Sequence, residues 1–302
     1  MEKGRPKNID LLMKQAQTDF TAYNMVVNGI GRKEPWVPSK FHHYQCQKVQ
    51  KFIETETDNP YDVLIINTPP QHGKSLTISE TLPSWYLGRN PEKRVLEVSY
   101  NSEFAENFGK RNRDKIAEFG SAIFGVGLSK ATKSTKEWLL DNDIGGMKSC
   151  GFDGSITGRK GNLIIIDDPI KNRKDAHSET YRKNIWGAWR TDIKSRFHNG
   201  TKVIIIMTRW HEDDLAGRLI KTEKYLEVIN LPIECVDEND PLYKLGFRGI
   251  GDALCPEINK DNKWVQDFKE SYINSDPDDE EGGGLADWYS LYQGEPTIVF
   301  VS

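Results

Sequence analysis

Residues 63–75 read VLIINTPPQHGKS, and this stretch decides how the chain is organised. Residues 63–67 form a short apolar run that is typical of a strand buried on both faces. The tripeptide Gly73, Lys74 and Ser75 follows, and helix-compatible sequence continues from Lys74. A strand, a loop that ends in GKS and a helix together make the P-loop pattern, which binds phosphate through backbone N–H groups and a lysine. The stretch therefore predicts a nucleotide site in an α/β fold.

Each residue of the GKS tripeptide has a defined task in this pattern. Gly73 lets the backbone approach a phosphate, Lys74 reaches the β- and γ-phosphates of ATP, and the Ser75 hydroxyl binds Mg²⁺. One position departs from the pattern, because Thr68 stands where the first glycine is expected. A surface loop that contains GKS by chance is the alternative. The loop residues that we expect to contact the nucleotide are Pro70, Gln71, His72, Gly73, Lys74, Ser75 and Leu76.

A second apolar run, residues 163–166 (LIII), leads directly into Asp167 and Asp168. Two carboxylates at the end of a buried strand are typical of a Walker B segment. We expect Asp167 to hold Mg²⁺ with Ser75, and Asp168 to polarise the attacking water. An acidic turn without catalytic function is the alternative. Because another strand, 95–100, precedes this segment, the order favours the P-loop class in which an additional strand separates the two phosphate-site strands.

The rest of the chain alternates between helix-like and strand-like segments. We expect helices over residues 9–27, 43–55 and 103–119, strands over 95–100 and 203–207, and a hairpin over 138–149. This order predicts a mainly parallel sheet that is flanked by helices.

The apolar strand runs stop after about residue 215, and the sequence from Pro232 onward is polar and irregular. We therefore predict a small C-terminal subdomain, a lid or linker, that is not part of the sheet. The predicted division of the chain is an N-terminal helical segment (1–40), an ATPase core (41–214) and the lid or linker (215–302).

Thr208, Arg209 and Trp210 come directly after the strand at 203–207. A polar residue at such a strand end can sense the γ-phosphate and pass its state to moving parts. The alternative is a helix N-terminus that is capped by Thr208 or by the acids that follow it.

Composition and charge narrow the functional classes. Apolar residues make up 37% and charged residues 28%, as in ordinary globular proteins. The formal net charge is −4, but residues 157–202 hold eleven Lys or Arg against five Asp or Glu. This basic middle suits a phosphate-rich partner, and a merely solvated basic face is the alternative. No apolar run is long enough for a membrane span and no signal peptide is evident, so we expect a cytosolic protein. The four cysteines form no C-x-x-C pair, so we expect them to be reduced.

Four motifs together resemble the large terminase subunit of tailed bacteriophages, the ATPase of a DNA-packaging motor. They are PPQHGKS (69–75), SYNSEFAENFGKRNR (99–113), ITGRKGNLIIIDDPIKNRKDA (156–176) and MTRWHEDDLAGRLI (207–220). The segment DWYSLYQGEP (287–296) resembles the one that closes the ATPase region of the family. Members usually carry a nuclease domain after it, and we find no spaced set of acids for such a site. We expect an ATPase domain without nuclease activity.

The resemblance implies roles for matching residues near the phosphates. Lys74 and Ser75 correspond to the Walker A pair, and Asp167 corresponds to the Walker B metal ligand. Asp168 stands where many members have a glutamate, which is one methylene longer, so Glu179 or Glu212 is an alternative base. Gln71 stands where the family often has arginine, so a positive charge near the phosphates is missing.

The resemblance also implies roles further from the phosphates. Arg159 corresponds to the arginine finger, which reaches the ATP of a neighbouring subunit. The alternative is that Arg159 faces DNA or solvent, and Lys160 is then the candidate for the finger. Thr208 corresponds to the start of the coupling motif. Gln45, with Tyr44, corresponds to the adenine-reading element, and a polar helix face is the alternative.

The implied function is ATP hydrolysis, with ATP and Mg²⁺, that drives double-stranded viral DNA into a procapsid in the host cytoplasm. The implied partners are the portal protein, the small terminase subunit and further copies of the chain in a ring. Basic residues within 171–196 can contact DNA, whereas Trp186 and Trp189 are more typical of core residues. A helicase-like translocase and a non-catalytic assembly protein with a degenerate nucleotide site are the alternatives.

Overall fold

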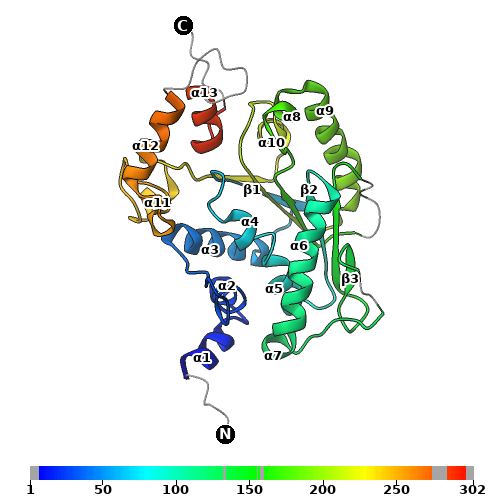
Figure 1. Ribbon diagram of the computed structural model, residues 1–302. Helices are drawn as coiled ribbons and strands as arrows, with labels where there is room; N and C mark the ends of the chain where they lie inside the picture. Colours follow the sequence, from blue (N-terminus) through cyan, green and yellow to red (C-terminus); the bar gives the residue numbers. More distant parts are fainter. Residues whose placement is uncertain (1–6, 132–133, 155, 157–159, 274–283, 297–302) are drawn as a thin grey trace.

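The computed structural model describes residues 7–131, 134–154, 156, 160–273 and 284–296. At its centre is a seven-stranded sheet with the order β3-β4-β2-β5-β6-β1-β7 (Figure 1). All neighbouring strands are parallel except the antiparallel pair of β3 and β4. The strands are β1 Tyr61–Asn67, β2 Arg94–Ser99, β3 Glu137–Leu139, β4 Gly146–Gly151, β5 Leu163–Asp167, β6 Thr201–Met207 and β7 Leu226–Asn230.

Strand β6 lies between β1 and β5, as the additional-strand class predicts. Asn67 is in register with Met207, and Asp167 is in register with Ile206, so the carboxyl ends of the three strands lie at one level of the sheet. The predicted fold class is confirmed. Loops that leave these ends converge on one edge, which is where open α/β sheets bind ligands.

Helices cover both faces of the sheet (Figure 1). Most are short, and π-helical turns extend α6 at Ile116–Gly120, α9 at Trp189–Ile193 and α13 at Trp288–Tyr292. The helices are α1 Lys7–Gln15, α2 Phe20–Gly29, α3 Lys40–Glu54, α4 Lys74–Thr77, α5 Leu82–Arg89, α6 Ser102–Lys115, α7 Ser121–Phe124, α8 Arg173–His177, α9 Glu179–Ala188, α10 Leu215–Thr222, α11 Pro241–Lys244, α12 Asn262–Ile273 and α13 Leu285–Asp287.

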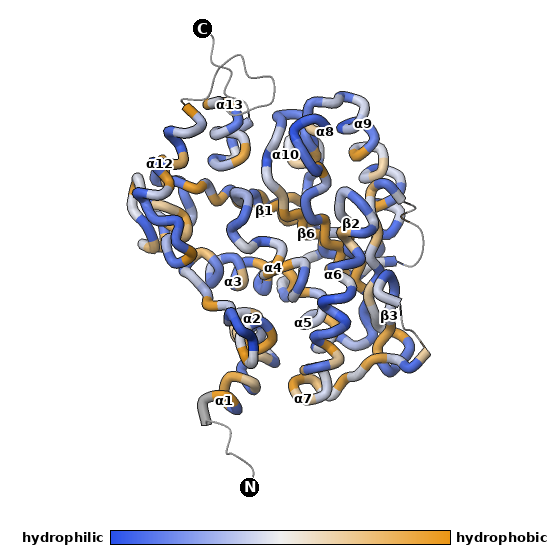
Figure 2. Tube along the Cα trace, viewed as in Figure 1, coloured by the Kyte–Doolittle hydropathy of each residue, from blue (hydrophilic) through white to orange (hydrophobic). Residues whose placement is uncertain are grey.

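The central strands separate two apolar cores. Every residue of β5 and β6 is buried, and Figure 2 shows the apolar strands β1 and β6 in the interior of the chain. Because successive side chains point to opposite faces, Leu64 and Ile66 pack with α2, α3 and α5, whereas Val63 packs with α9 and α10. Trp189 is fully buried in the second core, so its interpretation as a core residue is confirmed.

The prediction of one continuous helix over residues 9–27 is wrong. The chain forms α1 and α2 instead, separated by a turn. The side chain of Asp19 accepts a hydrogen bond from the backbone N–H of Ala22 at 2.6 Å, and this cap starts a new helix.

The prediction that the sheet ends before residue 215 is also wrong. Strand β7 pairs in parallel with β1 and forms the edge of the sheet. Its residues Glu227 and Val228 are exposed, so no continuous apolar run marks it. Residues after β7 build a smaller cluster around Ile233, Val265 and Trp288, and α11, α12 and α13 lie together on one side of the sheet in Figure 1.

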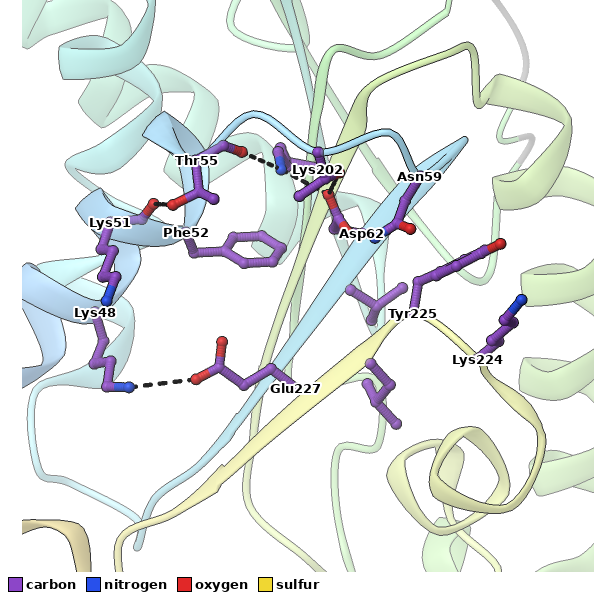
Figure 3. Close-up of a pocket in the computed structure, with 13 residues that line it drawn as sticks. Lys48, Lys51, Phe52, Thr55, Asn59, Asp62, Lys202, Lys224, Tyr225 and Glu227 are labelled. Atoms are coloured by element: carbon purple, nitrogen blue, oxygen red, sulfur yellow. Dashed lines mark hydrogen bonds and ion pairs between the residues drawn. The ribbon is translucent and has the colours of Figure 1, made fainter.

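A cavity of about 430 Å³ lies at the amino ends of β1, β6 and β7, opposite the edge described above (Figure 3). Two of the lysines that line this cavity, Lys202 and Lys48, have their ammonium groups paired with other residues of the chain. Lys202 donates to Asp62 at 2.6 Å and to the carbonyl of Thr55 at 2.7 Å, and Lys48 lies 3.3 Å from Glu227. These contacts tie α3 to the sheet, and we assign the cavity a structural role.

Replacing Lys202 with methionine should lower the free energy of unfolding by about 2 kcal/mol, because Asp62 is left without its cation in a nearly buried position. Lys48→Met is the matched control, because its pair with Glu227 is exposed and should contribute less than about 1 kcal/mol. Urea unfolding of both variants measures the difference. Equal losses would contradict the structural role of the buried pair.

Candidate functional site

The loop between β1 and α4 has the backbone of an anion-binding site. Gln71 and Gly73 both adopt left-handed conformations, with φ angles of 57° and 74°. The backbone N–H groups of residues 71–76 make no hydrogen bond to the part of the chain that the structure describes. Successive free N–H groups at the start of a helix form a concave site for a phosphate.

Glycine is required at position 73 for two reasons. Its φ angle is positive, and a Cβ atom there would lie 3.0 Å from Nε2 of His42. His42 Nε2 also lies 3.1 Å from the carbonyl oxygen of His72, so α3 packs directly against the loop. Burial lowers the pKa of His42 to about 4, and burial together with the charge of Lys260 lowers the pKa of His72 to about 3. Both imidazoles are therefore neutral at pH 7.

The side chain of Lys74 links the ends of three strands. Its ammonium lies 2.8 Å from Oδ2 of Asp168, which follows β5. It also donates to the hydroxyl of Thr208, which follows β6, at 2.6 Å. Lys74 itself is only 5% exposed. The sequence placed these residues 94 and 134 positions apart, and the sheet brings them into contact.

The two adjacent acids lie in different environments. Asp167 is fully buried, and neither carboxylate oxygen has a hydrogen-bond partner within the described residues. Burial and the charge of Asp168 raise the pKa of Asp167 to about 7, while Lys74 and the hydroxyls of Ser79 and Ser75 lower it. An unpartnered carboxylate near a serine hydroxyl fits the hard oxygen ligands that Mg²⁺ prefers, with further positions left to water and phosphate.

Asp168 faces the cavity, whereas Asp167 lies behind it. The backbone of Asp168 has a φ angle of 40°, which is a strained value for a residue other than glycine. Two contacts hold this conformation: the backbone N–H of Asp168 donates to the carbonyl of Ile206 at 3.0 Å, and Thr208 N–H donates to Asp168 Oδ1 at 2.9 Å. The carboxylate is thus fixed next to Lys74 while it stays accessible.

These groups meet in a cavity of about 590 Å³ at the carboxyl edge of the sheet. Most of the residues singled out in the sequence line it, but the buried residues His72 and Asp167 do not. Aromatic and basic residues from the segment after β2, from α6 and from the segment after β5 also line the cavity, and the sequence alone predicts no role for them there. The cavity is lined by Pro70, Gln71, Gly73, Lys74, Ser75, Leu76, Tyr100, Phe104, Asp168, Ile170, Lys171, Thr208 and Trp210.

Lys171 is the clearest functional candidate that was missed at this cavity. The sequence marks it only as one member of a basic stretch, yet its ammonium lies 5.7 Å from the ring centroid of Tyr100 at the cavity. Its position three residues after Asp168, at the end of a phosphate-site strand, was the available signal.

Thr208 is not the cap of α10. The cap is Asp214, whose side chain accepts from the N–H of Gly217 at 2.9 Å and pairs with Arg209 in a fully buried contact. Of the two capping alternatives, the one in which an acid after Thr208 caps the helix is therefore confirmed, and that acid is Asp214. The hydroxyl of Thr208 binds Lys74 instead.

Other predicted residues lie away from the cavity. Gln45 is buried on α3 with no partner for its amide among the described residues, and it is not part of the cavity lining. Glu179 pairs with Lys183 at 2.6 Å on an exposed helix start, and Glu212 is exposed, so neither lines the cavity. Arg159 lies outside the described residues.

Further features bear on the class of site. Among the described residues, no group of three or more His, Cys, Asp or Glu side chains is arranged to hold a metal ion by itself. No described helix is both long enough and apolar enough to cross a membrane. The four cysteines are buried, and none of them lies in a disulfide in the structure.

A family model described as the terminase large subunit, T4likevirus-type, N-terminal, matches residues 65–290. Comparison of the sequence with characterised proteins gave no match. The large terminase of bacteriophage HK97 superposes with a TM-score of 0.54 at 13% identity, over 92% of this chain and 54% of that protein. This chain therefore spans about half the length of the HK97 protein, and the two share a fold.

Two other solved structures have lower TM-scores. The large terminase ATPase domain of Thermus phage P74-26 superposes with a TM-score of 0.49 at 11% identity, over 86% of this chain and 94% of that domain. The large terminase of a thermophilic bacteriophage, in complex with ADP, gives a TM-score of 0.37 at 12% identity, over 63% of this chain and 44% of that protein.

Gly73→Ala should weaken ATP binding by about 10-fold or more, because the added Cβ meets His42 and the left-handed backbone is strained by roughly 1–2 kcal/mol. The matched control is Gly125→Ala, which has the same φ of 74° but nothing within 4 Å of the added atom. Both variants should lose stability through the left-handed backbone, Gly73→Ala somewhat more because of the contact with His42, and only Gly73→Ala should lose affinity in calorimetric titration. Unchanged affinity in Gly73→Ala would show that the loop does not contact the nucleotide.

Proposed function

The chain belongs to the terminase large-subunit family, and from this premise we propose that it is an ATPase that drives double-stranded DNA into a viral procapsid. The observation that carries the proposal is the contact of Lys74 with Asp168 and Thr208 beside a loop of free N–H groups. P-loop enzymes place three such groups around a phosphate loop for phosphoryl transfer: a lysine, an acid and a polar residue at a strand end.

We assign phosphate binding to the loop and to Lys74. The free N–H groups of residues 71–76 bind phosphate oxygens, and the ammonium of Lys74 leaves Asp168 to neutralise the γ-phosphate. Ser75 and Asp167 would hold Mg²⁺, which supplies positive charge that stabilises the transferred phosphoryl group. Asp167 is suited to this role because its buried carboxylate has no partner among the described residues.

Asp168 is the proposed base. Once Lys74 moves to the phosphate, the carboxylate of Asp168 is free to accept a proton from a water molecule in the cavity. The oxygen of that water then bonds to the γ-phosphorus as the bond to the β,γ-bridging oxygen breaks, which gives ADP and phosphate. Asp168 is preferred to Glu179 and Glu212 because it lines the cavity and they do not.

Thr208 is the proposed coupling residue. Its hydroxyl binds Lys74, and its backbone N–H binds Asp168, so any change in the partners of these residues reaches Thr208 directly. The buried pair of Arg209 and Asp214 then connects this segment to the start of α10. Coupling of this kind requires a contiguous set of contacts, and these residues provide one.

The wider assembly is proposed from the family. We propose a ring of subunits around the DNA, a portal protein and a small terminase subunit as partners, and assembly in the host cytoplasm. Contacts to DNA should be mainly to phosphates, because a motor that accepts any sequence cannot depend on base contacts. The adenine role of Gln45 stays a prediction, as does a role for the basic residues after Asp168.

Lys74→Ala and Asp168→Asn should each lower steady-state ATP hydrolysis by about 10²-fold or more, because each removes a charge that acts in the transition state. Lys263→Ala is the matched control, since this lysine is exposed and pairs with Asp267 away from the cavity. Phosphate release measured with and without Mg²⁺ checks the result. Wild-type activity no higher than that of Lys74→Ala would support the non-catalytic alternative.

For Arg159 we propose a role in trans, as the finger that completes the site of a neighbouring subunit; such fingers contribute roughly 10³–10⁵-fold to the rate. Arg159→Ala and Lys74→Ala should each be inactive alone. A mixture should regain part of the activity, because some sites then combine an intact Lys74 with an intact Arg159. No regain in mixtures that sedimentation shows to be assembled would contradict the role in trans.

A further inference from the structure

Lys260 reaches the phosphate loop from the far end of the sequence. Its ammonium donates to the backbone carbonyl of Gln71 at 2.9 Å, across a separation of 189 residues. Lys260 belongs to the segment between a 3-10 turn, Pro256–Ile258, and α12. The loop that binds phosphate is thus in contact with the region that follows β7, which the sequence divides from the ATPase core.

The segment that carries Lys260 is held in place by several contacts. Lys260 forms an isolated β-bridge with the fully buried Cys255, and Asn259 between the turn and Lys260 has a left-handed φ of 63°. The ammonium lies 5.3 Å from the ring centroid of Trp264, which belongs to α12. Burial lowers the pKa of Lys260 below its usual value. The cation is therefore presented to the loop by an ordered support.

The contact constrains the peptide unit between Gln71 and His72. In a planar trans peptide the C=O and N–H groups point in opposite directions. Holding the carbonyl of Gln71 toward Lys260 therefore directs the N–H of His72 to the other side. This peptide lies between the two left-handed residues of the loop, Gln71 and Gly73, where the backbone is strained and needs external contacts to keep its shape.

Lys260 also supplies charge to the loop. Lys74 is already paired with Asp168, so a second ammonium at Gln71 makes the loop more attractive to an anion. Its charge reaches the loop interior, because it contributes to the lowered pKa of His72.

We propose that Lys260 is a positioning residue of the nucleotide site: it fixes the Gln71–His72 peptide for phosphate binding, and it makes nucleotide affinity depend on the region that follows β7. The inference rests on the proposed nucleotide function of the loop. Because Lys260 acts on the loop and not on the reacting atoms, its loss should affect binding of ATP and ADP alike and leave the chemical step nearly unchanged.

The test compares Lys260→Met with Lys260→Arg in the full chain. Methionine keeps the length and the apolar packing but removes the donor, so the dissociation constants of Mg·ATP and Mg·ADP should rise about 10-fold, the typical effect of losing a charged hydrogen bond. Arginine keeps a cationic donor and should restore affinity to within about 3-fold. At saturating ATP, kcat should stay within about 2-fold of wild type in both variants. Lys263→Met, an exposed lysine three residues along, is the control and should change nothing.

The outcomes separate this inference from the proposed function. Wild-type affinity in Lys260→Met, or a loss in Lys260→Arg as large as in Lys260→Met, would overturn the role of Lys260 while hydrolysis by wild type still supports the ATPase. Affinities that follow the expected order without any hydrolysis would support Lys260 and overturn the ATPase. A wild-type chain that binds neither nucleotide would overturn both.

Discussion

The ammonium group of Lys74 is the interaction on which the rest of the site depends. It joins the P-loop to Asp168 and Thr208, so three strand ends share one buried cation. Without it, the fully buried carboxylate of Asp167 would lie beside the carboxylate of Asp168 with no cation paired to either of them among the described residues, and charges interact more strongly near a protein interior than in water. The buried strands that bring the two acids together therefore make a cation favourable at this point. In the proposed function, a phosphate competes with Asp168 for this ammonium.

Much of this arrangement could be predicted from short stretches of sequence. The apolar runs of β1, β5 and β6 are continuous because these strands are buried on both faces, and a polar or acidic group follows each run. Parallel strands place their carboxyl ends at one edge, so GKS, the two acids and Thr208 had to lie near one another once the fold class was recognised. At these positions the short sequence motifs and the order of the strands in the sheet predict the same site.

Other features could not be predicted, for reasons that are also physical. Strand β7 has one partner strand and exposes Glu227 and Val228, so its burial pattern resembles a loop. The contact of Lys260 with Gln71 depends on how the region after β7 packs, and no spacing in the sequence encodes it. Asp167 is fully buried, whereas Asp168 faces the cavity with a left-handed backbone angle, and a dipeptide of identical residues reveals neither difference.

Backbone strain gives a further measure of how the site is held. In the described part of the chain, the residues other than glycine with positive φ are Gln71, Asp143, Asp168 and Asn259. Gln71 and Asp168 lie at the cavity, and Asn259 directly precedes the lysine that contacts Gln71. Such conformations cost roughly 1–3 kcal/mol each and persist only where surrounding contacts fix them. The strain at Asp168 is held by Ile206 and Thr208 within the core, whereas the strain at Gln71 is held by a residue from beyond β7. The contact of Lys260 with Gln71 therefore links the loop between β1 and α4 to the region after β7, in addition to the contact of His42 with His72 that links it to α3.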